Sequence, residues 1–169
     1  NPHLVATQRD SLELFGRNNA KWFDRNGFPY FTREVYDAFY PGYGASWPSY
    51  YGAIAMTYER GSARGLLADR RRGPDFHYRD SVRQHFVASI ATAETAAVNH
   101  DRLWRDFRAY HESAVSEGRR ETLGAYIIPG GHDDAAAFRL AGLLSQQGVN
   151  VLSAKNAFSA CGQKYPGGS

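Results

Sequence analysis

One carboxylate in this sequence stands where acid–base chemistry would place it. Glu59 closes the run Tyr51–Glu59 (YGAIAMTYE), in which apolar side chains alternate with small ones and no residue before Glu59 is charged. This composition predicts a largely buried β-strand that ends at the carboxylate. Because burying a carboxylate costs free energy unless it has a partner or a function, Glu59 is a candidate general acid or base.

A loop rich in aromatic residues precedes the expected strand. Residues 40–48 (YPGYGASWP) contain two glycines, two prolines and a serine, which is typical of a structured loop. Tyr40, Tyr43 and Trp47 are placed to close over a pocket beside Glu59. A phenol next to a carboxylate suits acid–base work on a polarised carbonyl group.

Two other interpretations of these residues stay open. In the first, Glu59 forms a structural ion pair with Arg60 or Arg64, and the aromatic side chains belong to the core. In the second, the chain is a catalytically inert module that binds a peptide or a glycan on its aromatic loop.

The stretch from Tyr40 to Glu59 resembles part of the zinc carboxypeptidase family (carboxypeptidase A-like metallopeptidases). That family has a Gly/Ser-rich loop with a mobile tyrosine, then a tryptophan, then a Gly–Ile step and a strand that ends Thr-aromatic-Glu. The corresponding residues here are 40–47 (YPGYGASW), 52–54 (GAI) and 57–59 (TYE). The chain is most similar to the bacterial branch, over roughly residues 1–115, although its Gly-to-Glu spacing is one residue shorter than in animal members.

The resemblance implies a role for each of these residues. Glu59 matches the general base, which activates zinc-bound water and later protonates the leaving amine. Tyr40 matches the tyrosine that caps the C-terminal residue of the substrate; Tyr43 is the alternative, because the distance from Tyr40 to Trp47 is shorter than in animal members. Ala45 lies where animal members line the specificity pocket, and a small neutral residue there argues against basic C-terminal side chains.

The zinc ligands of the family do not appear in this sequence. The family binds zinc through a His-x-x-Glu pair and a later histidine, all before the matching stretch. None of the six histidines here has a glutamate three residues on; the nearest approach, His77 to Asp80 (HYRD), is expected to begin a helix. We therefore expect the ligands upstream of Asn1, and a chain that alone neither holds catalytic zinc nor hydrolyses peptides.

Composition sets the class of protein. The chain has 169 residues, of which 43% are hydrophobic and 22% charged, with a net charge of +3, which excludes a disordered chain, a collagen and a coiled coil. No apolar stretch approaches the length of a transmembrane helix, and a single cysteine, Cys161, excludes an internal disulfide. We expect a peptide substrate, no nucleic-acid partner, no membrane partner and, from the resemblance, a secreted or periplasmic location.

Hydrophobic periodicity predicts the elements that position these residues. Residues 2–26 are expected to form a helix that stops at Gly27, and residues 28–39 a short strand and a short helix from Thr32. Residues 76–117 predict one long helix, or two with a break near Asn99, ending at Gly118.

Composition changes near Thr122. Two short apolar runs, 125–128 (AYII) and 149–152 (VNVL), flank an expected helix over 135–147, which predicts a β-α-β unit with parallel strands. The expected fold class is therefore α/β. Residues 1–118 would be the C-terminal half of a carboxypeptidase-like domain, a mixed sheet flanked by helices, and residues 122–169 the start of a second α/β module.

Overall fold

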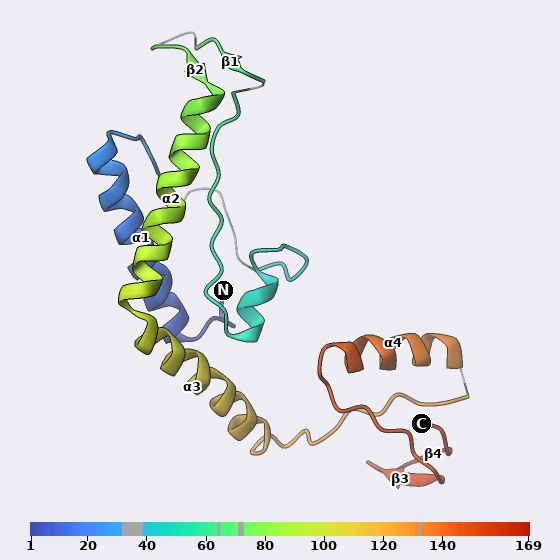
Figure 1. Ribbon diagram of the computed structural model, residues 1–169. Helices are drawn as coiled ribbons and strands as arrows, with labels where there is room; N and C mark the ends of the chain where they lie inside the picture. The colour runs from blue at the N-terminus through green and yellow to red at the C-terminus, as the bar shows by residue number, and fades with distance from the viewer. Residues whose placement is uncertain (32–38, 64, 71–72, 132) are drawn as a thin grey trace. The chain divides into compact units, whose positions relative to one another are not determined.

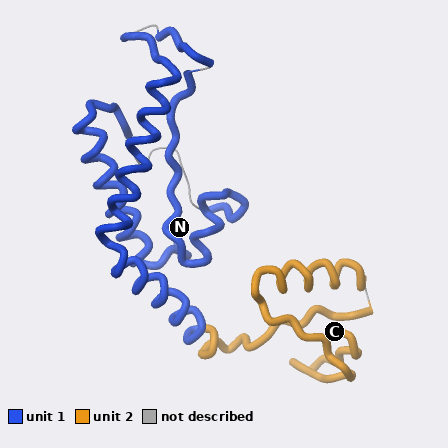
Figure 2. The backbone as a smooth tube through the Cα atoms, in the orientation of Figure 1, with its two compact units in different colours: residues 1–117 blue, residues 118–169 orange. Residues whose placement is uncertain are grey.

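The computed structural model describes residues 1–31, 39–63, 65–70, 73–131 and 133–169 (Figure 1). Over these residues it combines α-helices with two small two-stranded sheets, so the chain is a mixed helix-and-sheet protein. It divides into two compact units, Asn1–Glu117 and Gly118–Ser169 (Figure 2). The division falls at the edge of the boundary predicted between residues 118 and 123. The helix expected from Thr32 lies outside the described residues.

Helix α1 spans Ala6–Asn26, so it begins four residues later than predicted. The residues before it form a turn instead, in which the Leu4 N–H donates to the Asn1 carbonyl at 3.4 Å. The predicted stop is confirmed: Gly27 adopts a left-handed conformation with φ of 65°, and its N–H donates to the Asp24 carbonyl.

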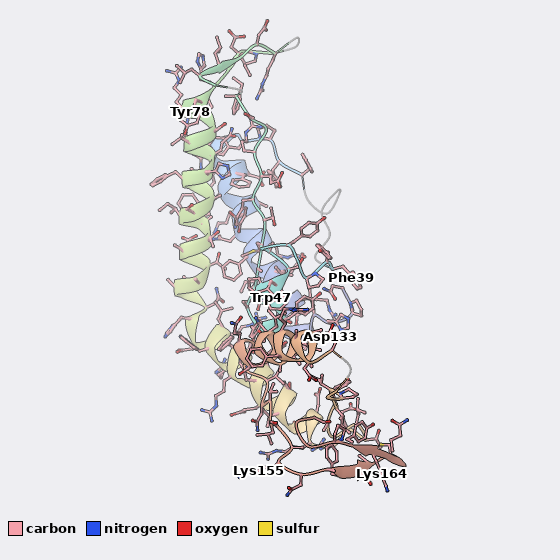
Figure 3. The ribbon with its side chains drawn as sticks, turned by 90° about the vertical axis from the view of Figure 1, so that its right-hand side faces the viewer. Phe39, Trp47, Tyr78, Asp133, Lys155 and Lys164 are labelled. Carbon is pink, nitrogen blue, oxygen red and sulfur yellow. The ribbon has the colours of Figure 1, made fainter. Side chains whose placement is uncertain are left out.

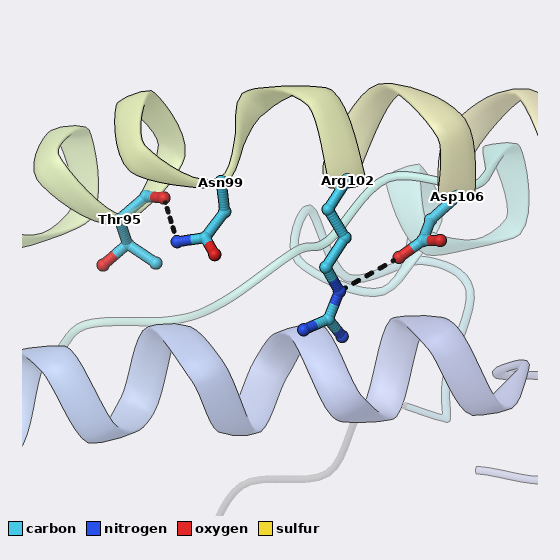
Figure 4. Close-up of polar contacts among 4 residues, drawn as sticks. All are labelled: Thr95, Asn99, Arg102 and Asp106. Carbon is cyan, nitrogen blue, oxygen red and sulfur yellow. Dashed lines mark hydrogen bonds and ion pairs between the residues drawn. The ribbon is translucent and has the colours of Figure 1, made fainter.

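The long periodic segment forms two helices, α2 (Tyr78–Val98) and α3 (His100–Gly118), separated by Asn99 as the second alternative predicted. Asn99 leaves the helical conformation, and its side-chain Nδ2 donates to the Thr95 carbonyl at 2.8 Å (Figure 4). The side chain thus satisfies a carbonyl beside the break. At the other end of α2, the Asp80 carboxylate accepts the N–H of His77 at 2.9 Å, so the HYRD run begins a helix as expected.

Helices α1 and α2 lie side by side and hold the core of the first unit (Figure 1). Asn18 of α1 joins them: its Nδ2 donates to the Ala91 carbonyl at 3.0 Å and to Thr95 Oγ1 at 2.9 Å. Small and polar residues fill much of this interface, which lets the helix backbones approach closely. The buried residues of the two helices are Gln8, Ser11, Phe15, Asn19, Val87, Ala88, Ala91 and Thr95.

The prediction of a buried strand over Tyr51–Glu59 is wrong. A 3-10 helix, η1 (Trp47–Tyr51), takes its first residue, Gly52 turns the chain with φ of 82°, and residues 53–63 are extended but join no sheet with another described residue. Residues 53–56 are half-buried, and residues 57–59 are exposed. The apolar alternation is present, but the segment meets helices on one side and has no neighbouring strand in the part of the chain that the structure describes.

The sheets are also smaller than the expected mixed sheet. In the first unit, β1 (Leu67–Ala68) pairs antiparallel with β2 (Phe76–His77). In the second unit, β3 (Phe158–Ala160) pairs antiparallel with β4 (Gln163–Tyr165).

The predicted β-α-β unit is wrong in its strands. Its helix is present as α4 (Asp134–Gln146), capped by Asp133, whose carboxylate accepts the Ala136 N–H at 2.9 Å. Residues 125–128 and 149–152 form no strand. Parallel strands need cover on both faces, whereas Tyr126 and Leu152 in these runs are 86% and 80% exposed.

Candidate functional site

The extended segment that carries Glu59 is fastened to α1 at two points. Gln8 Nε2 donates to the Ala53 carbonyl at 2.9 Å, and Asn19 Nδ2 donates to the Tyr58 hydroxyl at 2.9 Å. The two anchors on α1 are eleven positions apart, which corresponds to a rise of about 16 Å along the helix. Five extended residues cover about the same distance, so the segment runs straight along the helix and in the same direction.

Helix α2 also contacts this segment, on the same face as α1. The Tyr58 hydroxyl shares a hydrogen bond with Thr92 Oγ1 at 3.0 Å, and Arg60 Nε donates to Gln84 Oε1. The Arg60 guanidinium also lies over the buried ring of Phe76, with Cζ 4.1 Å from the ring centroid. Residues 53–60 therefore have one face turned to the α1–α2 pair.

Glu59 lies between two residues that face the helices, so its side chain is directed to the opposite face. Successive side chains alternate across an extended chain, and Tyr58 and Arg60 both reach the helix pair. Glu59 is exposed, where the sequence predicted burial. The alternative of an ion pair with Arg60 or Arg64 stays a prediction, because Arg64 lies outside the described residues.

The environment of Arg60 shifts its own ionisation. Desolvation lowers the pKa of Arg60 below its ordinary value, the positive charge of Arg70 lowers it further, and Asp80 opposes both. Arg70 lies over the same Phe76 ring at 4.6 Å. These contacts give Arg60 a structural role beside Phe76 of the β1–β2 hairpin.

The four residues expected to bind substrate lie together in one turn. The Tyr43 N–H donates to the Tyr40 carbonyl at 3.2 Å, and the Trp47 N–H donates to the Tyr43 carbonyl at 3.0 Å. The Tyr40 and Tyr43 rings meet edge to face at 5.2 Å, and Ala45, between Tyr43 and Trp47 in the sequence, is half-buried. Tyr40 is 59%, Tyr43 53% and Trp47 43% exposed, so these rings are not core residues. Figure 3 labels Trp47 among the side chains of the chain.

The structure does not bring Glu59 and this aromatic turn together. Glu59 lies seven extended residues beyond Gly52, or roughly 20 Å along the segment. The turn is held at the near end of the segment, where Gln8 Nε2 also donates to the Ser49 carbonyl at 2.8 Å. The proton-transfer and binding parts of the predicted site are thus separately anchored.

Two residues of α1 that position the site were not identified from the sequence. Gln8 and Asn19 are both buried, at 4% exposed, and both donate to the extended segment. Their signal is two amide side chains eleven residues, or about three helical turns, apart on one face of an amphipathic helix.

The described residues contain no group of three or more His, Cys, Asp or Glu side chains arranged to hold a metal ion. Among them, none of the helices is both long and apolar enough to cross a membrane. No family model, no curated protein and no solved structure matches this chain.

Proposed function

We propose that this chain supplies the general base and a substrate-binding turn of a zinc-dependent metallocarboxypeptidase, an enzyme that removes the C-terminal residue from peptides. One observation carries the proposal: Glu59 is solvent-exposed on an extended segment that is fixed to two helices through the neighbouring side chain of Tyr58 and through Ala53. The aromatic turn, η1 and Gly52 precede it in the order that the sequence resemblance implies.

The hydrogen bonding of the segment supports a place in a larger sheet. Ile54 to Tyr58 makes no backbone–backbone hydrogen bond to another described residue. Extended backbone that is covered on one face and open along its edges is suited to pair with further strands. In the proposed enzyme, other segments of the domain complete that sheet around Glu59.

Glu59 acts in this proposal as a proton acceptor and then as a proton donor. Its carboxylate takes a proton from the attacking water and returns it to the leaving amine. The described residues do not by themselves form a zinc site, so the metal would be held by residues outside this chain. Tyr40, with Tyr43 as the alternative, and Trp47 contribute contacts to the substrate.

The test is Glu59→Gln in the full-length peptidase. Glutamine keeps the shape of the side chain but cannot accept the proton, so we expect kcat to fall about 10²-fold or more, with KM and the melting temperature nearly unchanged. Glu117→Gln, an exposed glutamate at the end of α3, is the matched control and should keep full activity. Normal turnover in Glu59→Gln would overturn the proposal.

A second candidate function is favoured by the exposed aromatic side chains. Tyr40, Tyr43, Trp47 and Tyr51 are each at least 40% exposed, as are the rings of a stacking surface. A peptide- or glycan-binding module without catalysis would lose binding in Trp47→Ala and be indifferent to Glu59→Gln. Hydrolysis that depends on Glu59 excludes this candidate.

A further inference from the structure

Gly52 is the point where the aromatic turn and the Glu59 segment meet. Its φ of 82° lies in the left-handed region that favours glycine. On one side of it, η1 ends in two hydrogen bonds: the Gly52 N–H donates to the Ser49 carbonyl and the Ala53 N–H donates to the Pro48 carbonyl, both at 3.1 Å. On the other side the chain is extended. The backbone angles at Gly52 therefore set the direction of the turn relative to Glu59.

A side chain from α3 contacts both η1 and Gly52 itself. The Tyr110 hydroxyl donates to the Tyr50 carbonyl, in η1, at 2.8 Å. The Tyr110 ring covers Gly52 so closely that a Cβ added there would lie 2.7 Å from its Cδ1. Tyr110 is 60 residues away in sequence, and it is half-buried by this contact.

An apolar cleft of about 370 Å³ adjoins the same contact. Ile54, Leu103, Trp104 and Phe107 line it together with Tyr110 itself. The space beside the ring is open, so removal of the Tyr110 side chain would enlarge this cleft. Gln8 of α1 also holds this pivot, since its Nε2 donates to the Ser49 carbonyl at 2.8 Å and to the Ala53 carbonyl at 2.9 Å. Tyr110 and Gln8 together therefore set the orientation of the pivot.

We infer that Tyr110 is a positioning residue for the proposed site: it fixes the pivot at Gly52 and so holds the aromatic turn in register with the Glu59 segment. The inference rests on the proposed function for its catalytic consequence. Its structural content, a clamp on the pivot, is independent of that function. A merely structural residue would change global stability; a clamp changes the local opening of η1 and the binding of substrate.

The first measurement is hydrogen exchange at the Gly52 and Ala53 amides in the full chain. Tyr110→Phe keeps the ring and deletes the hydroxyl, so we expect exchange to be about fivefold faster. Tyr110→Ala deletes both contacts and should accelerate exchange about tenfold or more. The control is Tyr126→Ala, at a tyrosine that is 86% exposed. Amides of α2 around Ala91 should not change in any variant.

Unchanged exchange at Gly52 and Ala53 in both Tyr110 variants would overturn the inference. So would an equal acceleration throughout α1 and α2, since that would report global destabilisation. If Tyr110→Ala does not fold, Tyr110→Phe alone decides the result, because it preserves the packed ring.

The second measurement separates this inference from the proposed function. In the full-length peptidase, we expect Tyr110→Phe to raise KM severalfold with a smaller change in kcat, the opposite of Glu59→Gln. Faster exchange together with an inactive wild type would leave the clamp standing and refute the proposed function. An active wild type with neither an exchange nor a KM effect would refute the clamp alone.

Discussion

Helices α2 and α3 follow each other with only Asn99 between them and have similar lengths, 21 and 19 residues, yet they are packed very differently. The first buries four residues against α1, among them Ala91 at 0% exposed, whereas no residue of the second is buried. The amphipathic pattern does not follow this difference in burial. It is stronger in α3 than in α2, although Trp104 of α3 is 67% exposed.

This difference shows that an apolar stripe does not by itself produce burial. Helix α2 presents small side chains to α1, so the two backbones approach closely and Asn18 reaches the Ala91 carbonyl. Helix α3 presents large rings, and the contact it makes with the rest of the unit through Tyr110 leaves an open cleft beside it. Packing depends on a neighbour of complementary shape as well as on the pattern.

The largest expected change in stability comes from removing a phenylalanine ring from each of the two regions. Phe15 of α1 is 5% exposed, and we expect Phe15→Ala to lower the free energy of unfolding by about 3–5 kcal/mol. Phe107 of α3 is 38% exposed, and Phe107→Ala should cost about 1 kcal/mol or less. Urea unfolding of the two variants measures both. Equal losses would show that α3 is as well packed as α1 and α2.

A smaller effect is expected from the hydroxyl that joins the extended segment to the helix pair. Tyr58→Phe removes the acceptor of Asn19 and the hydrogen bond with Thr92. We expect it to lower the free energy of unfolding by about 1 kcal/mol. Tyr78→Phe, at a tyrosine 57% exposed at the start of α2, is the control and should change little. No difference between them would mean that the segment is not held by these bonds.

The smallest effect concerns pH. Glu94 of α2 accepts hydrogen bonds from Trp22 Nε1 at 2.7 Å and from Asn18 Nδ2 at 2.9 Å, and these bonds lower the pKa of Glu94 below its ordinary value of 4.5. A lowered pKa in the folded state means that the stabilisation is complete above about pH 4.5 and is lost as the pH falls through the folded-state pKa.

Melting temperatures of the wild type and Glu94→Gln between pH 6 and pH 3 test whether stability is lost on acidification as expected. The wild type should lose more stability on acidification than the variant. Trp22→Phe removes the principal donor and should reduce the acid sensitivity in the same direction. A steeper acid loss in Glu94→Gln than in the wild type would contradict the assignment.

The helices were predictable from the sequence because their signals are local. Gly27 ends α1, Asn99 breaks the long segment, and Asp133 caps α4, each through hydrogen bonds to residues within four positions. The strands were not predictable in this way. A strand is defined by a partner, and the apolar runs at 51–59, 125–128 and 149–152 have no neighbouring strand among the described residues.

The residues of the candidate site also differ in whether their signals are local in the sequence. Glu59 and the aromatic turn were identified because their residue types and spacing lie within one short stretch of sequence. Gln8, Asn19 and Tyr110 were not, because each acts on that stretch from a helix 39 to 60 residues away. Their amide and hydroxyl groups become informative only when the fold places them against the segment.

The polar character of the α1–α2 interface has a consequence for how this chain responds to heat. Unfolding raises the heat capacity chiefly by exposing apolar surface to water. Here Gln8, Ser11, Asn19 and Thr95 occupy buried positions, while large side chains such as Trp104 are already in contact with solvent in the folded state. Unfolding therefore uncovers little new apolar surface. We therefore expect a small change in heat capacity on unfolding and a flat stability curve for the first unit, so that cooling destabilises it less than it destabilises proteins with large apolar cores.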